Sequence, residues 1–166
     1  YPVAYKIDYR VRETQEELYG EKASKQAVGT IIGGYIPGDG EFHRGRCDLA
    51  TANVRDQDDF TATLRHEILG HFGINTFTAR EKKAVLDAII DAKKESGLSV
   101  LWAIVDKNYN KLSPLQKAEE VYALACETID PQKEVNTAKG DRSLRDICID
   151  KKRKMQMSDL VNITSM

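Results

Sequence analysis

The histidine pair in the segment 64–74 (LRHEILGHFGI) constrains the fold more than any other feature of the sequence. His66 and His71 are five residues apart within an apolar pattern of helical period. Each residue of a regular α-helix advances by about 100°, so side chains five residues apart point about 140° away from each other. Both imidazoles can therefore face one point only if the helix is locally distorted.

A turn with i→i+5 hydrogen bonds would remove this conflict. Such a turn has roughly 4.4 residues, which reduces the step to about 82° and brings side chains five residues apart to within about 50°. One-residue bulges of this kind occur frequently at functional sites. Gly70, just before His71, would bear a distorted backbone most easily. The spacing thus predicts a specific widening of the helix.

Polar residues on this otherwise apolar helix need partners if they are buried. Glu67 follows His66 directly, where a general base must lie to reach a water molecule activated by zinc. Two imidazoles and a further donor are a typical catalytic zinc set. The alternatives are a surface cluster and a group of core histidines with satisfied hydrogen bonds.

Strand patterns precede the helical patterns along the chain. Residues 3–11, 29–40 and 46–54 are strand candidates with rough alternation or Pro/Gly turn ends, and 13–27 suggest a short helix and loop. Helices are predicted over 58–72, 78–96, 98–105, 114–129 and 142–154, with N-caps at Asp58 or Asp59, at Thr78 and at Ser113. We expect one α+β domain over residues 1–166, a small sheet followed by a helical bundle.

Composition excludes several classes of function. The formal net charge is −1, which gives no indication of a nucleic-acid partner. Residues 139–155 hold seven Lys and Arg against three Asp, but little aromatic interleaving, as in a solvated helix end. No apolar run is long enough to cross a bilayer, so no membrane partner is expected. Three cysteines without a C-x-x-C pair argue against a disulfide framework and against a thiolate zinc site.

The motif HEILGHFG at 66–73 resembles the H-E-x-x-x-H variant of zincin metallopeptidases, seen in tubulin-tyrosine carboxypeptidases and their bacterial relatives. It resembles more closely the H-E-x-x-G-H-x-G pattern of peptidase-like domains in large polyvalent proteins of phages and conjugative elements. The resemblance covers residues 29–127 and implies a zincin-like fold, with a mainly antiparallel N-terminal sheet and a metal site on the helical bundle. It also implies a bacterial cytoplasmic protein of a mobile genetic element, with delivery into another cell as an alternative.

The third metal ligand implied by these families is a glutamate in an E-x-x-A context on a later helix. The matching segment is EEVYALACE at 119–127, in which Glu120 precedes Ala123 by three residues. Small Ala123 would allow two helices to approach. The expected Zn²⁺ ligands are therefore His66, His71 and Glu120. Glu119 and His43 stay open as alternatives to Glu120 as the third ligand.

The resulting hypothesis is hydrolysis of a peptide bond in an extended peptide or protein substrate. Zinc would lower the pKa of a bound water and polarise the scissile carbonyl, and Glu67 would act as general base. By analogy, the strand at 47–53 would pair with the substrate. Three tyrosines could stabilise the oxyanion, with none favoured: Tyr35, Tyr109 and Tyr122. The alternative function is a non-catalytic, metal-stabilised binding domain of a mobile-element or effector protein.

Overall fold

The computed structural model describes residues 7–26, 33–37, 45–128, 154–157 and 159–160. Several predicted features lie outside these residues. They are His43, Cys148, almost all of the basic segment 139–155 and nearly the whole helix expected over 142–154. The prediction of a single domain over 1–166 stays a prediction.

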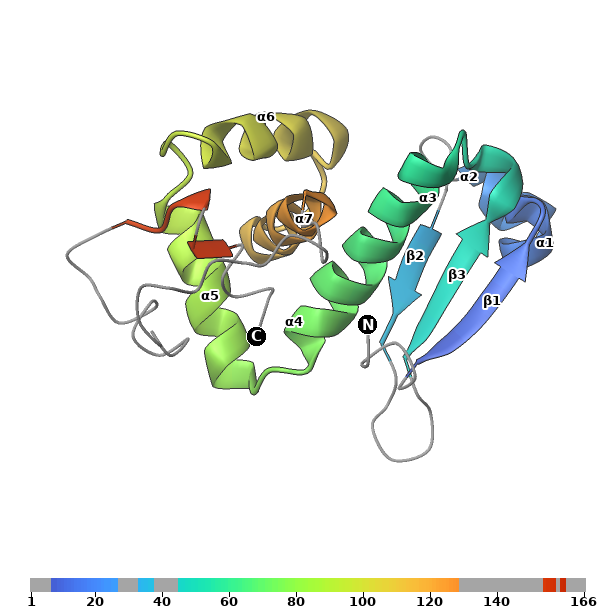
Figure 1. Ribbon diagram of the computed structural model, residues 1–166, viewed down its shortest axis with the longest axis horizontal. Coiled ribbons are helices and arrows are strands. Elements are labelled where there is room, and N and C mark those ends of the chain that lie inside the picture. Colours follow the sequence, from blue (N-terminus) through green and yellow to red (C-terminus); the bar gives the residue numbers. More distant parts are fainter. Residues whose placement is uncertain (1–6, 27–32, 38–44, 129–153, 158, 161–166) are drawn as a thin grey trace.

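A three-stranded mixed sheet occupies one end of the molecule (Figure 1). Its strands are β1 (Asp8–Arg12), β2 (Gly33–Ile36) and β3 (Arg46–Ala50), in the order β1-β3-β2. β3 runs parallel to β1 and antiparallel to β2. The predicted zincin-like fold with a mainly antiparallel sheet is therefore wrong, and the described chain is mostly helical, α+β only in a loose sense.

The direction of β1 explains this error. Two short helices, α1 (Gln15–Tyr19) and α2 (Glu21–Gln26), follow β1, and the chain returns through β2 before it enters β3 in the direction of β1. α1 packs against both β1 and β3. Alternation in a sequence shows which face of a strand is apolar, but it carries no information about the direction of the neighbouring strand.

A long helical segment follows the sheet and lies between it and the remaining helices (Figure 1). After the short 3₁₀ turn η2 (Thr51–Asn53) it comprises α3 (Gln57–Leu64), the π-helix η3 (Arg65–Phe72) and α4 (Gly73–Asn75). Asp56 is the N-cap, because its carboxylate accepts a hydrogen bond from the Asp59 backbone N–H at 2.8 Å. The cap thus lies upstream of the predicted Asp58 or Asp59.

Three further helices complete the described fold: α5 (Ala79–Asp91), α6 (Leu98–Asn108) and α7 (Pro114–Glu127). Thr78 and Ser113 are N-caps as predicted, each within a capping box whose third helical residue is Glu81 or Gln116. No helix among the described residues is both long and apolar enough to pass through a membrane.

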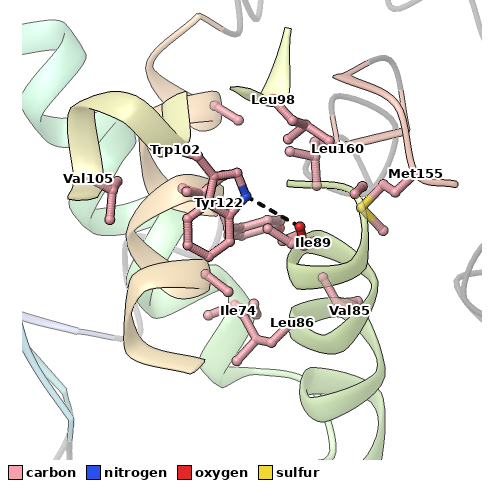
Figure 2. Close-up of a cluster of buried hydrophobic side chains, with 14 of the residues drawn as sticks. Ile74, Val85, Leu86, Ile89, Leu98, Trp102, Val105, Tyr122, Met155 and Leu160 are labelled. Carbon is pink, nitrogen blue, oxygen red and sulfur yellow. Dashed lines mark hydrogen bonds between the residues drawn. The ribbon is translucent and has the colours of Figure 1, made fainter. Parts of the chain in front are cut away.

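Two hydrophobic cores flank the long helical segment. The larger one joins α5, α6 and α7, where Trp102 donates a hydrogen bond from Nε1 to the Ile89 carbonyl at 3.3 Å (Figure 2). The smaller core lies between the sheet and η3 and consists of five buried residues: Ile7, Cys47, Leu49, Ile68 and Phe72. The helix η3 therefore contributes to the sheet-side core while its other face meets α7.

Candidate metal centre

The π-helix η3 contains both histidines of the motif and confirms the predicted widening. The ring centroids of His66 and His71 are 5.0 Å apart, and the ring planes meet at 68°. In a regular α-helix the two rings would point to nearly opposite sides. The additional residue between the histidines is thus absorbed by the helix itself.

Gly70 lies within the π-helix, as predicted, and also has a role in helix packing. The described glycines with positive φ are Gly20 and Gly97, so Gly70 does not use a left-handed conformation. A Cβ at Gly70 would instead lie 2.6 Å from both Cα and Cβ of Ala123 on α7. Gly70 and Ala123 together let the backbones of η3 and α7 approach closely, which confirms the predicted role of a small residue at 123.

Glu120 on α7 faces both histidines. Its Oε2 is 3.6 Å from His66 Nε2, and its Oε1 is 3.6 Å from His71 Nε2. The ligand atoms of His66, His71 and Glu120 all lie within 4.8 Å of one another. Two donors that each lie about 2.1 Å from a tetrahedral zinc ion are roughly 3.4 Å apart, so this set has a spacing that suits such an ion.

Two other glutamates hold the outer nitrogens of the imidazoles. His66 Nδ1 is 2.8 Å from Glu127 Oε1, and His71 Nδ1 is 3.3 Å from Glu119 Oε1. Because a carboxylate only accepts, each Nδ1 carries the proton and donates it. Metal-bound histidines usually have such a partner, which fixes the tautomer and the ring orientation. Glu119 thus contacts the Nδ1 side of His71, whereas Glu120 lies on the Nε2 side of both rings.

Electrostatics favour a positively charged His66 in the metal-free protein. Burial lowers its pKa, but the nearby carboxylates of Glu120 and Glu127 outweigh burial and raise the pKa to about 10. For Glu119, burial raises the pKa, but hydrogen bonds from His71 and Lys82 outweigh it and lower the pKa. A cation that binds at His66 Nε2 must therefore displace a proton there.

Glu67 is buried, with 6% of its surface exposed. Burial, and after it the charge of Glu67, raises the pKa of the Cys47 thiol on β3 to about 12. The charge of Glu67 also acts on His66 and on Tyr109, so its carboxylate lies within electrostatic reach of both the central strand and the candidate metal centre. Glu67 is adjacent in sequence to His66, which keeps it beside the predicted ligand set.

The structure separates the three candidate tyrosines. Tyr122 is 1% exposed and belongs to the larger core, so it is not available to the site. Burial, followed by the charges of Glu120, Glu67 and Glu127, raises the pKa of Tyr109 at the end of α6. Tyr109 therefore lies within electrostatic reach of the site. The side chain of Tyr35 is outside the described part of the structure.

The strand predicted to pair with a substrate is the wrong one. β3 is the central strand, with β1 and β2 on its two sides, so its backbone groups are already used in the sheet. β2 is the outer strand that packs against η3. The sequence at 46–54 shows alternation but not whether the strand is central or at an edge, so the error has the same origin as the error in strand direction.

Three residues that contact the histidines or their partners were not assigned a role from the sequence. Glu127 lies seven residues after Glu120 on the same helix, and this helical spacing is a signal that could have identified it. Asn75 and Lys82 join the network of His71 and Glu119 from α4 and α5. No local sequence pattern links these two residues to α7.

The chain is similar to a protein named DNA primase TraC from Escherichia coli, with 40% identity over 174 residues. The whole chain is matched, but it spans 12% of the length of that relative. No family model and no solved structure matches the chain. The name of the relative describes a much longer protein, and the chemistry of this segment has to be argued from its own residues.

Proposed function

We propose that this chain is a zinc-dependent metallopeptidase segment, in which His66, His71 and Glu120 bind zinc and Glu67 is the general base. The observation that carries the proposal is the position of one carboxylate, whose two oxygens each lie 3.6 Å from a histidine Nε2. The H-E-x-x-x-H motif and the resemblance to zincin peptidases of polyvalent proteins support the same function.

The donor set favours zinc over magnesium. Imidazole nitrogens suit zinc, whereas magnesium prefers carboxylates, water and phosphate oxygens in octahedral geometry. Enzymes that transfer nucleotides rely on magnesium held by carboxylates. A site with two imidazoles and one carboxylate therefore supports hydrolysis by this segment, even though its much longer relative is named a DNA primase.

Bound zinc supplies a Lewis acid for the scissile carbonyl and lowers the pKa of a water molecule. Glu67 accepts a proton from the attacking water and transfers it to the amine nitrogen as the C–N bond breaks. The water oxygen becomes part of the new carboxyl group, and the amine leaves with the transferred proton. Glu119 and Glu127 hold the rings of His71 and His66 in place, and the burial of Glu67 limits its exchange of protons with solvent.

The proposed substrate is an extended peptide or protein segment. β2 is an outer strand of the described sheet and packs against η3, so a peptide that pairs with the edge of β2 opposite β3 would lie near the histidines. The proposed setting is the bacterial cytoplasm, as part of a larger protein of a mobile genetic element. We propose neither a nucleic-acid nor a membrane partner for this segment.

A metal-stabilised binding domain without hydrolysis is the alternative. This function requires the ligands but not Glu67, because binding of a metal or partner needs no general base. The position of a buried carboxylate directly after the first histidine, where a general base must lie to reach a water molecule activated by zinc, favours catalysis.

Elemental analysis and a peptide-library cleavage assay test the proposal in three proteins. The wild type should contain one zinc ion per chain and cleave peptides. Glu67→Gln should keep the zinc and lose cleavage by a factor of about 10²–10⁴, the usual contribution of general base catalysis. His71→Ala should lose both. Full activity in Glu67→Gln would disprove the assigned role, and a zinc-loaded but inactive wild type would favour the binding domain.

A further inference from the structure

His71 is held from two directions. Its Nδ1 is 3.3 Å from Glu119 Oε1, and its backbone carbonyl accepts a hydrogen bond from Asn75 Nδ2 at 2.6 Å. Asn75 Nδ2 also lies 3.5 Å from Glu119 Oε1. Glu119 thus contacts the ring of His71, Asn75 contacts its backbone, and these two side chains also contact each other.

Lys82 connects these two neighbours. Its Nζ lies 2.8 Å from Glu119 Oε2 and donates a hydrogen bond to Asn75 Oδ1 at 2.9 Å. The side chains of Lys82 and Glu119 are 25% and 19% exposed, so this ion pair is more sheltered than an ordinary surface pair. The capping box of Thr78 and Glu81 fixes the first turn of α5, from which Lys82 projects.

Glu119 would otherwise compete with Glu120. Both are neighbours on α7, and both carboxylates lie beside His71, one at Nδ1 and one at Nε2. A carboxylate that is free to rotate can bind a cation itself or accept the proton of the wrong ring nitrogen. The contact with Lys82 uses Glu119 Oε2, which leaves Oε1 directed at His71 Nδ1.

We infer that Lys82 is a positioning residue of the metal centre, which holds Glu119 and Asn75 so that His71 presents Nε2 to the cation. This inference rests on the proposed metal site and adds a residue from a third helix to it. Lys82 would act through Glu119 and would not contact the metal or the substrate. Loss of the lysine should therefore weaken zinc binding without removing any ligand.

A double-mutant cycle on the 166-residue chain tests this inference. Lys82→Met, Glu119→Gln and the double variant are compared with the wild type and with Lys83→Met. Lys83 is a matched control, because it is the next residue of the same helix and forms an exposed ion pair with Asp87. The zinc dissociation constant is measured by competition with a chelator, and the visible spectrum is recorded after Co²⁺ substitution. Unfolding of the chelator-treated protein reports on stability alone.

Lys82→Met should weaken zinc binding by about tenfold and Glu119→Gln by about 10–100-fold, the usual range for residues that orient metal ligands. The double variant should be no weaker than Glu119→Gln, because the lysine acts through that carboxylate. Both single variants should shift the Co²⁺ bands, Lys83→Met should match the wild type, and Lys82→Arg should restore binding.

Three results would overturn the inference. One is equal zinc affinity in Lys82→Met and Lys83→Met. Another is a loss in the double variant equal to the product of the two single losses. The third is a wild type that binds no zinc, which would overturn the metal site as well. A wild type that binds zinc but cleaves nothing would overturn only the peptidase function and leave the cycle informative.

Discussion

The two sides of η3 are built in different ways. On the helical side, the larger core is continuous and apolar, and α7 adds three glutamates that face the two histidines. On the sheet side, the core is much smaller, and the opposite face of the central strand carries the buried carboxylate of Asp48. The charge of Glu67 acts on both sides, on Cys47 of β3 and on Tyr109 at the end of α6. The proposed ligand Glu120 comes from the helical side, whereas Ile68, the residue after the proposed base, packs in the sheet-side core.

This difference separates two measurable properties. Changes on the helical side should alter zinc affinity, because the third ligand and the residues behind both histidines come from α7. Changes on the sheet side should alter turnover more than zinc affinity, because the packing of β3 against Ile68 supports the neighbouring Glu67.

Leu49→Ala and Leu86→Ala form a matched pair, one in each core. Both leucines are buried, at 2% and 4% exposure. Each substitution should lower the free energy of unfolding by about 3–4 kcal/mol through lost burial and a residual cavity. Denaturant titration measures this loss. Below the unfolding range, only Leu49→Ala should reduce cleavage at saturating zinc, and an equal loss of activity in both variants would contradict the separation.

Asp48→Ala should be the next most destabilising change. The carboxylate is fully buried and accepts bonds from both Arg10 and Arg46, with shortest contacts of 2.7 Å. Removal of one partner from a buried ion pair is costly, but the two guanidinium groups are partly exposed and can regain water. We therefore expect a loss of about 2–3 kcal/mol in denaturant titration. Zinc affinity should stay within a factor of two of the wild type.

Gly70→Ala should affect both properties at once. The added Cβ would lie 2.6 Å from the backbone and side chain of Ala123, so η3 and α7 must move apart. We expect about 2 kcal/mol of destabilisation and weaker zinc binding, because Glu120 moves with α7. Calorimetry with and without zinc measures both. Gly73→Ala is the control, since its Cβ would meet only the Ile68 carbonyl at an ordinary 3.5 Å. Equal zinc affinities in the two variants would show that this contact does not set the site.

Ser113→Ala should have the smallest effect. Ser113 Oγ accepts the backbone N–H of Gln116 at the start of α7 and lies far along the helix from Glu127. Loss of this cap should cost about 1 kcal/mol in thermal unfolding and leave zinc affinity unchanged. A drop in zinc affinity would mean that fraying of the first turn reaches Glu119 and Glu120.

Local spacing was sufficient to predict the π-helix, because the angle between two side chains depends only on the number of residues per turn. The caps at Thr78 and Ser113 were also predictable, because each cap and its hydrogen-bond partner are only three residues apart. Glu120 was predicted as the third ligand from a family resemblance and from its position on one face of a helix. The structure brings its carboxylate to both histidines, and its binding of zinc stays a prediction.

Other features depend on contacts between distant segments. The parallel pairing of β1 with β3 joins residues about forty positions apart, such as Arg10 and Asp48, and no local pattern specifies its direction. The contact of Lys82 with Glu119 joins the first turn of α5 to the second turn of α7 and was missed because either residue alone resembles a solvated charge. Asp56 was missed as a cap because three aspartates occur together at 56, 58 and 59.

The widened turn also bears on how the length of this segment could change. Deletion of Leu69 would restore a four-residue interval between the histidines, and an ordinary α-helix could then place both rings on one side. Four steps of about 100° turn the chain nearly as far as five steps of about 82°, so the deletion would leave the residues beyond it, including the fully buried Ile74, in nearly the same orientation. The additional residue is thus accommodated within the widened turn alone, and the helical segments on its two sides keep the relative rotation of an α-helix that is one residue shorter.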